Sequence, residues 1–375
     1  MQASALATML TSVLASVQAS ALATMLASVL ASALATMLAS VPLYPSTGSS
    51  SSLGSENMDS EGEETMRVNR WGNSTTNSTN EENSGSDEEM FHIYSGDCNV
   101  LEEVYAKYMV VECICIGGFG GTYSGFRRKD NFLVVLKYIS KRNVTFTEME
   151  VNGAMCRLPL EVSLLIQVGA GPDSSGSNIT PLLLDWYDLG SEIVLVIERP
   201  EPCVDLVDYL RSQETNVLEP AKAQYFFGQL VEATIEMEAK GVFHRDIKPK
   251  NVLIETGEEN RARFIDFGCG TTFTPGQTFD EPQGTALYGS PEWFRKKRYA
   301  ARPVTVWQLG LTLYAMLFSR KSLISECTSG SRRRVSFPCP VSDECRDLLK
   351  GCLAINPKKR LTLEKIRDHP WLNAA

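Results

Sequence analysis

The chain has 375 residues, with 36 Lys and Arg against 45 Asp and Glu, and a formal net charge of −9. Hydrophobic residues make up 43% and charged residues 22%, which is ordinary for a protein with a buried core and excludes a collagen-like or wholly disordered chain. The ten cysteines are too few for a disulfide scaffold and include no CxxC pair. We therefore expect free thiols in a reducing compartment and no zinc site.

The first 53 residues contain no Asp, Glu, Lys or Arg, and the sequence ASALATML begins there three times, at Ala3, Ala19 and Ala31. These spacings match no common solenoid repeat. Ala, Leu and Met favour helix, but Ser and Thr recur throughout and the basic flank of a signal peptide or membrane anchor is missing. Residues 1–53 are thus predicted to be low-complexity helix or coil, with a membrane span as the alternative.

Residues 54–90 hold ten acidic and two basic residues, and therefore −8 of the net charge of −9. This composition predicts a disordered, solvated linker and says little about a partner. Asn73 and Asn77 begin N-S-T triplets, but nothing else in the sequence indicates the secretion that glycosylation requires.

Residues 91–375 have nearly balanced charge and the patterns of one globular unit. Strands are predicted over residues 108–116, 121–128, 131–140, 182–188 and 192–198, with a short helix near Leu158–Gln167. The pattern then turns helical, over residues 220–241, 304–318, 342–353 and 361–372. Strands followed by helices predict an α+β fold with a small β-rich lobe and a larger helical lobe.

A glycine-rich run, IGGFGG at residues 116–121, lies between the first two expected strands. Such a turn lets backbone N–H groups approach phosphates, although a tight hairpin would use the same residues. Lys137 lies in the middle of the third apolar strand, where a cation needs a partner. Glu161 in the following helix is the candidate partner.

The strongest signal is the pair of motifs HRDIKPKN at residues 244–251 and IDFG at residues 265–268. Phosphoryl transfer needs a carboxylate to orient the attacking hydroxyl, a cation near the γ-phosphate, and ligands for Mg²⁺. Asp246, Lys248, Asn251 and Asp266 provide these groups in the expected order. The spacing predicts a kinase active site.

From about Tyr105 to Leu372 the chain resembles a eukaryotic protein kinase. The glycine loop with TYSG, ERPEP at residues 198–202, PLEV at 159–162, PEW at 291–293 and HPW at 369–371 resemble the Pim family of serine/threonine kinases. The resemblance implies a bilobal protein kinase domain over residues 105–372, with an N-lobe over 105–198 and a C-lobe over 203–372. SPE at residues 290–292 stands where the activation segment ends, so Glu292 is expected to pair with Arg360.

The resemblance also implies a role for each catalytic residue. Lys137 would contact the α- and β-phosphates of ATP and pair with Glu161, and Asp246 would orient the substrate hydroxyl. Lys248 would steady the γ-phosphate, and Asn251 and Asp266 would hold Mg²⁺. Lys248 and Thr285 favour Ser/Thr over Tyr substrates.

For the nucleotide, the resemblance implies that Glu198 offers its carbonyl to adenine, that Pro200 cannot donate, and that Asp205 meets the ribose. The remaining nucleotide contacts would come from the glycine loop and the pocket walls, namely Ile116, Gly117, Gly118, Phe119, Gly120, Thr122, Val135, Ile197, Leu253 and Ile265.

Four positions depart from the usual kinase pattern. Cys115 replaces the first glycine, Thr122 a valine, Val135 the alanine before the strand lysine, and Thr305 an aspartate often found before the Trp of a later helix. None removes a charge that the chemistry needs. Pim-like kinases resemble this chain in lacking the aspartate at Thr305, whereas Cys115, Thr122 and Val135 support the alternative of a weakly active kinase or a pseudokinase binding module.

Two features bear on regulation and substrate choice. Asp280 or Glu281 is expected to pair with Arg245 in place of a phosphate, which would make the kinase constitutively active. Lys250 stands where the family is acidic, and residues 319–334 read SRKSLISECTSGSRRR. We therefore expect a weakened preference for basic substrates, with Asp205 and Asp208 still selecting Arg.

By resemblance, such a kinase acts in cell-survival and proliferation signalling, in the cytoplasm, the nucleus or both. The expected partners are ATP and proteins with Ser or Thr, without nucleic acid or membrane, and the expected oligomeric state is a monomer.

Overall fold

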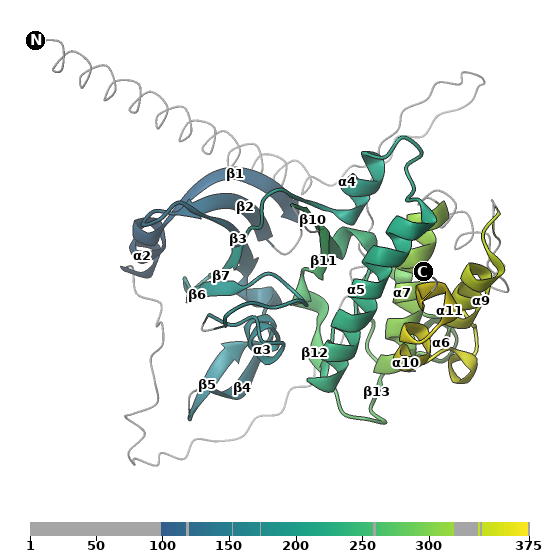
Figure 1. Ribbon diagram of the computed structural model, residues 1–375. Coiled ribbons are helices and arrows are strands. Elements are labelled where there is room, and N and C mark those ends of the chain that lie inside the picture. Colours follow the sequence, from purple (N-terminus) through teal and green to yellow (C-terminus); the bar gives the residue numbers. More distant parts are fainter. Residues whose placement is uncertain are drawn as a thin grey trace, which may run out of the picture. The chain divides into compact units, whose positions relative to one another are not determined.

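A computed structural model describes residues 99–117, 120–151, 153–172, 174–257, 260–318, 337 and 340–373 (Figure 1). All of them lie in one unit, Glu64–Ala375. The predictions for residues 1–53, for residues 54–90 and for residues 319–334 fall outside the described residues.

The N-lobe is built on an antiparallel sheet in the order β1-β2-β3-β7-β6. Its strands are β1 (Tyr108–Gly117), β2 (Gly120–Arg127), β3 (Phe132–Ser140), β6 (Leu183–Asp188) and β7 (Glu192–Glu198). All five strands were expected from the sequence. Alternate residues of β7 point to opposite faces: Val194 and Val196 pack toward α2 (Asn99–Lys107), and Ile193 and Leu195 face the main core.

A hairpin and a short helix follow β3. The hairpin pairs β4 (Phe146–Val151) with β5 (Ala154–Pro159) and was not expected from the sequence. Helix α3 (Leu160–Gln167) continues directly from β5 and agrees with the predicted helix. Its first turn holds Glu161, which is buried.

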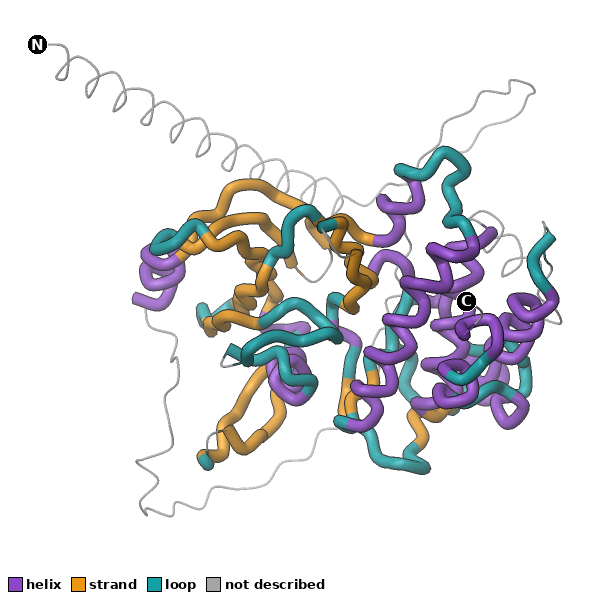
Figure 2. Tube along the Cα trace, in the orientation of Figure 1, coloured by secondary structure: helices purple, strands orange, loops and turns teal. Residues whose placement is uncertain are grey.

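The C-lobe is mainly helical and packs around α7 (Ala301–Phe318), as Figure 2 shows. Every residue of α7 from Val304 to Phe318 is buried, which is typical of a helix at the centre of a lobe. The surrounding elements are α4 (Leu206–Arg211), α5 (Pro220–Ala239), α9 (Asp343–Cys352), α10 (Leu363–Arg367) and α11 (Pro370–Asn373). No helix among the described residues is long and apolar enough to cross a membrane.

Short strands fix the segments between the lobes. A small sheet joins β8 (Cys203–Asp205), β10 (Val252–Thr256) and β11 (Asn260–Phe264). The segment after β11 begins with the turn η3 (Phe267–Cys269), and β12 (Thr271–Thr272) then pairs with β9 (Val242–Phe243). Farther on, β13 (Thr278–Phe279) pairs with β14 (Tyr299–Ala300). The turn η4 (Ala286–Tyr288) and helix α6 (Pro291–Lys296) lie between them, so the segment is tied to the C-lobe at both ends.

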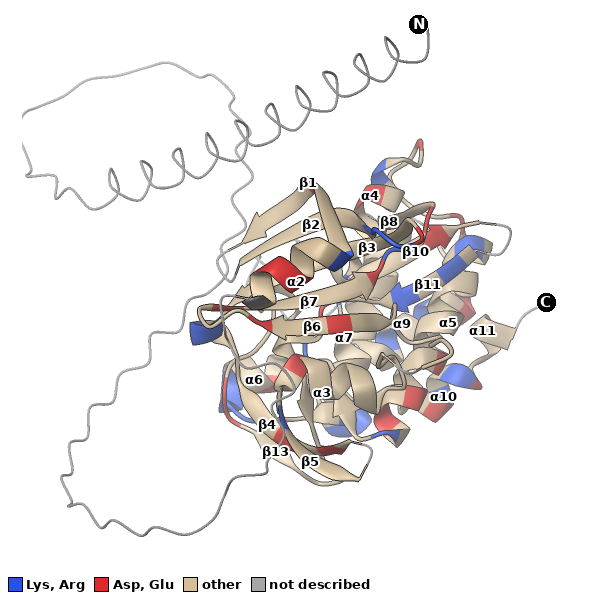
Figure 3. Ribbon diagram, turned by 90° about the vertical axis from the view of Figure 1, so that its left-hand side faces the viewer, with Lys and Arg blue, Asp and Glu red and all other residues tan. Residues whose placement is uncertain are grey.

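Acidic and basic residues are intermingled over the folded part in the view of Figure 3. This agrees with the nearly equal numbers of acids and bases that the sequence has from Phe91 onward.

Candidate active site

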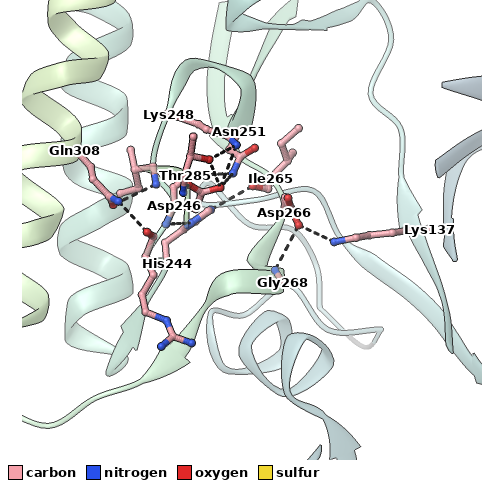
Figure 4. Close-up of polar contacts among 12 residues, drawn as sticks. Lys137, His244, Asp246, Lys248, Asn251, Ile265, Asp266, Gly268, Thr285 and Gln308 are labelled. Carbon is pink, nitrogen blue, oxygen red and sulfur yellow. Dashed lines mark hydrogen bonds and ion pairs between the residues drawn. The ribbon is translucent and has the colours of Figure 1, made fainter. Parts of the chain in front are cut away.

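A partly buried lysine joins the two lobes (Figure 4). The ammonium of Lys137 on β3 lies 2.7 Å from Glu161 Oε1 on α3 and 2.7 Å from Asp266 Oδ1. The expected contact between Lys137 and Glu161 is therefore present. Burial disfavours the charge of Lys137, but the carboxylates of Asp266 and Glu161 outweigh it and raise the pKa of this lysine. The charge of Lys137 in turn lowers the pKa of Asp266, so both groups are ionised at neutral pH.

The catalytic-loop aspartate is held from three sides. Asp246 is 4% exposed, and its Oδ1 accepts a hydrogen bond of 2.7 Å from the backbone N–H of Thr285. Asn251 Nδ2 donates to Asp246 Oδ2 at 3.1 Å and to its backbone carbonyl at 2.9 Å. Lys248 Nζ lies 3.2 Å from Oδ2 and donates to Thr285 Oγ1 at 2.6 Å. These bonds fix the carboxylate in one orientation beside a cation.

The groups expected to hold Mg²⁺ suit a hard cation. Asn251 uses its nitrogen to bind Asp246, so its amide oxygen faces away from that bond. Asp266 has a left-handed backbone (φ 66°) and a side chain that is 49% exposed. Because Mg²⁺ prefers oxygen ligands and takes the rest from phosphates and water, one carboxylate and one amide are a fitting set. The described residues hold no cluster of three or more His, Cys, Asp or Glu that would form a metal site of another kind.

The residues expected to wall the nucleotide pocket lie on adjacent strands. Thr122 on β2 pairs with Lys137 and with Cys115 on β1, and Val135 on β3 pairs with Ile197 on β7. On the C-lobe side, Leu253 on β10 pairs with Asp205, and Ile265 follows β11. Ile116 and Gly117 are exposed at the end of β1, whereas Gly118 and Phe119 lie outside the described residues.

Gly120 needs to be glycine. Its φ is +151°, and a Cβ added there would lie 1.8 Å from the backbone oxygen of Tyr138. A side chain at this position would therefore force β2 away from β3.

The segment at residues 198–202, which links the two lobes, is tied to the C-lobe by Arg263. This arginine was not singled out from the sequence. Glu198 Oε2 accepts hydrogen bonds from the backbone N–H of Leu182, at 3.0 Å, and from Arg263, at 3.4 Å. Arg263 is 4% exposed and also pairs with Glu255. It belongs to no kinase motif considered above. The available signal was its position in β11 between Ala262 and Phe264, two apolar residues that are buried with it, because a buried cation requires partners.

Both carboxylate oxygens of Asp205 have partners within the chain, which was not predicted from the sequence. Its Oδ1 caps α4 by accepting from Val207 N and Asp208 N, and its Oδ2 lies 2.7 Å from Lys250 Nζ. Asp208 pairs with Arg211 at 3.0 Å. The expectation that these two acids stay available to substrate arginines therefore needs correction: each is paired with a cation of the same chain.

The expected partner of Arg245 is also different. Its guanidinium donates to the backbone carbonyls of Cys269 and Gly270, the second at 3.1 Å. No ion pair joins it to Asp280 or Glu281 in the part of the chain that the structure describes, so the predicted ion pair is wrong. Carbonyls satisfy the guanidinium because η3 turns back toward the catalytic loop at this point.

A buried ion pair anchors the end of the segment, as expected. Arg360 makes two bonds to Glu292, of 2.9 and 2.8 Å, and the side chains are 0% and 5% exposed. Arg360 also donates to Ala354 O and lies over the ring of Trp307.

A two-lobed fold with an interlobe lysine, a buried loop aspartate and a DFG turn defines a protein kinase, and the comparisons agree. Residues 108–372 match the family model described as protein kinase domain. The chain is 34% identical to serine/threonine-protein kinase pim-2 of Danio rerio over 276 residues, which are 73% of this chain and 87% of that protein. It is 35% identical to serine/threonine-protein kinase prk-2 of Caenorhabditis elegans over 261 residues, which are 68% of this chain and 56% of that protein.

A more distant similarity, 29% identity, relates the chain to the PAS domain-containing serine/threonine-protein kinase of Mus musculus, covering 71% of this chain and 18% of that protein. The chain therefore belongs to the protein kinase family. It is a serine/threonine protein kinase similar to Pim kinases, and it uses ATP.

Proposed function

We propose that this protein is a constitutively active, Pim-like signalling kinase that uses ATP with Mg²⁺ and has a weakened preference for basic substrates. The observation that carries the proposal is the assembled site. Lys137 is paired with Glu161, and Asp246 is bonded to Thr285 and Asn251. Catalysis of phosphoryl transfer is mostly positioning and charge stabilisation, so an assembled site is what activity requires.

In this proposal the residues act as follows. Asp246 accepts the hydroxyl proton of the substrate, because its carboxylate is fixed and buried beside the cation of Lys248. Lys137 binds the α- and β-phosphates, and Lys248 the γ-phosphate. When bound between Asn251 and Asp266, Mg²⁺ would neutralise charge on the phosphates.

Constitutive activity follows from the contacts of Arg245. In many kinases a phosphate on the activation segment must pair with the arginine of the HRD motif. Here the guanidinium of Arg245 already bonds the carbonyls of Cys269 and Gly270, and β12 holds the start of the segment against β9. The arginine therefore needs no phosphate to become ordered.

The test is the activity of the purified chain before and after phosphatase treatment, with mass spectrometry to show that the phosphates were removed. We expect turnover to change by less than about twofold. A large loss on removal of phosphate from the segment's threonines (Thr271, Thr272, Thr274 or Thr278) would overturn the proposal.

The weakened preference for basic substrates rests on Lys250. Its ammonium neutralises Asp205, and burial, which would lower the pKa of this lysine, is outweighed by the ion pair, so the pKa is raised. Lys250 is therefore charged during turnover. A substrate arginine would have to compete with it for Asp205, and a charge near a partly exposed acid changes affinity by on the order of 1 kcal/mol.

A peptide array tests this idea. We expect the unmodified chain to select Arg weakly and Lys250→Glu to select it strongly, with Lys250→Met between them. A strongly basic profile in the unmodified chain, or an unchanged profile in Lys250→Glu, would count against the role of Lys250 and leave kinase activity itself untouched.

The second candidate, a weakly active binding module of the same fold, is favoured by the state of Asp205. Both of its oxygens are engaged within the chain, so the expected ribose contact has to displace Lys250. Autophosphorylation and ATP-titration assays on the full chain discriminate the two, because a weakly active kinase or a binding module would show little or no transfer even at saturating ATP.

A further inference from the structure

A glutamine of the central C-lobe helix contacts the catalytic loop on both sides of its aspartate. Gln308 lies on α7 and is 2% exposed. Its Oε1 accepts a hydrogen bond of 3.2 Å from the backbone N–H of Ile247, and its Nε2 donates to the backbone carbonyl of Arg245 at 2.8 Å. Figure 4 shows the side chain reaching from the helix to the loop. The two bonded groups flank Asp246, so one side chain fixes the peptides before and after it.

The backbone that Gln308 holds is strained. Arg245 has φ 66°, a left-handed conformation that residues with a β-carbon adopt at a cost. Such a conformation persists only where neighbouring groups enforce it. Gly284 lies close to the same peptide. A Cβ added at Gly284 would be 2.5 Å from the Arg245 oxygen and 3.0 Å from Asp246 Oδ1, so this position has no room for a side chain. The direction of the Asp246 side chain therefore depends on how this peptide is held.

Thr305 lies on α7 three residues before Gln308. Thr305 stands where kinases often carry aspartate, and it is 8% exposed. It lines a small cavity together with His244 and Ile247. In the described part of the chain, Gln308 makes the hydrogen bonds from α7 to the backbone of Arg245 and Ile247. It lies about one helical turn after Thr305.

We propose that Gln308 is a positioning residue, which fixes the Arg245–Ile247 backbone from α7 and thereby aims the Asp246 carboxylate. It touches neither ATP nor substrate. The inference rests on the proposed role of Asp246, and it predicts an effect on the rate of transfer and not on the affinity for ATP.

The competing explanation is that Gln308 only satisfies buried polar groups and stabilises the fold. Thr312 offers a matched control. It lies one turn farther on α7, is 0% exposed, and donates through Oγ1 to the backbone carbonyl of Gln308. Thr312→Val thus removes a buried hydrogen bond from the same helix without touching the loop.

The experiment measures kcat, KM for ATP and the melting temperature of the full chain, with a serine peptide that the unmodified chain phosphorylates. Gln308→Met keeps the side-chain length and removes both bonds. We expect kcat to fall by about 10- to 100-fold, since small misplacements of catalytic groups have effects of this size, while KM for ATP changes by less than about twofold. Thr312→Val should keep kcat within about twofold.

Gln308→Glu serves as the conservative variant and as the alternative where Gln308→Met does not fold. Its protonated carboxyl can accept from Ile247 and donate to Arg245, whereas its ionised form faces the Arg245 carbonyl with a negative charge. The ratio of its kcat to that of the unmodified chain should therefore fall as the pH rises from 6 to 9. A ratio that is constant over this range and within about twofold of one overturns the proposal.

The proposal also fails if Gln308→Met keeps kcat within about twofold of Thr312→Val, or if it raises KM for ATP and leaves kcat unchanged. Asp246→Asn is measured alongside. If Asp246→Asn is inactive and Gln308→Met is normal, only this inference fails. If Asp246→Asn keeps full activity, the proposed role of Asp246 fails first.

Discussion

The ion pair between Arg360 and Glu292 gives the largest stability effect that we expect from a single substitution. Both side chains are buried, and two parallel bonds of 2.9 and 2.8 Å join them. Arg360→Met leaves the Glu292 carboxylate buried without its counter-charge. Removing one partner of such a pair costs about 3–5 kcal/mol. For a domain of this size each kcal/mol lowers the melting temperature by about 2–4 °C, so we expect a fall of about 6–20 °C.

The measurement is urea unfolding of four proteins, namely the unmodified chain, Arg360→Met, Glu292→Met and the double variant. The double variant should recover part of the loss, because two apolar side chains leave no charge unpaired. Arg302→Met is the control. Its side chain is 59% exposed and pairs with Glu238, and exposed pairs contribute about 1 kcal/mol or less. The reasoning is refuted if Arg360→Met costs no more than Arg302→Met, or if the two single losses simply add.

Three further predictions concern pH, catalysis and the N-terminus. Burial lowers the pKa of His244, so below pH 6.5 the unfolded chain binds a proton that the folded chain does not, and stability falls as the pH drops toward the folded-state pKa. The free energy of unfolding should fall by at most about 1.4 kcal/mol per pH unit through His244, and this contribution should be absent in His244→Phe. Urea unfolding between pH 7.5 and 5.5 measures it. Equal slopes of the free energy of unfolding against pH in the two proteins would contradict the prediction. Asp246→Asn should abolish phosphate transfer with the melting temperature nearly unchanged, and Lys137→Met should also abolish transfer; wild-type turnover in either would disprove its assigned role. Deleting residues 1–90 should change neither turnover nor melting temperature, because that sequence lacks the periodicity of a core element, whereas a drop of more than a few degrees would indicate docking.

The regular elements of both lobes could be predicted because their sequence patterns are long. The N-lobe strands have apolar residues in alternation or in continuous runs, as buried strands do. The residues of α7 from Val304 to Phe318 are buried all round and most of them are apolar, so the helix predicted over residues 304–318 was the correct interpretation.

The β4–β5 hairpin was missed although the sequence carries a signal for it. The dipeptide Asn152-Gly153 between two short runs favours a tight hairpin turn. The flanking strands are six residues each, and their outer residues are charged or polar, such as Glu148, Glu150 and Arg157. With few buried positions, the alternation was too weak to distinguish strand from loop.

The candidate residues Asp246, Lys248, Asn251 and Asp266 could be selected from the sequence because they stand in two short motifs, HRDIKPKN and IDFG, whereas the nucleotide contacts were expected only from the resemblance. The spacing of the motifs along the sequence does not show which distant residues become their hydrogen-bond partners in the folded chain. Arg245 bonds two carbonyls, and every residue has a carbonyl, so no residue type marks Cys269 and Gly270 in advance. A search for charged partners leads to acids such as Glu281, whose own backbone carbonyl instead accepts from Tyr299.

The partner of Lys250 could not be predicted from the sequence either, because it depends on the register of a short strand. Leu253 on β10 pairs with Asp205 on β8, and this register brings β8 beside the catalytic loop, where Lys250 lies 2.7 Å from Asp205. A shift of β8 by one residue would turn Asp205 to the opposite face and leave Lys250 free to meet the substrate. β8 is only three residues long, and its last residue, Asp205, also caps α4, so one residue ends the strand and begins the helix. The carboxylate that starts a helix is thus the same one that pairs with the lysine beside the active site, and the proposed effect of Lys250 on substrate choice would depend on a helix cap 45 residues earlier in the chain.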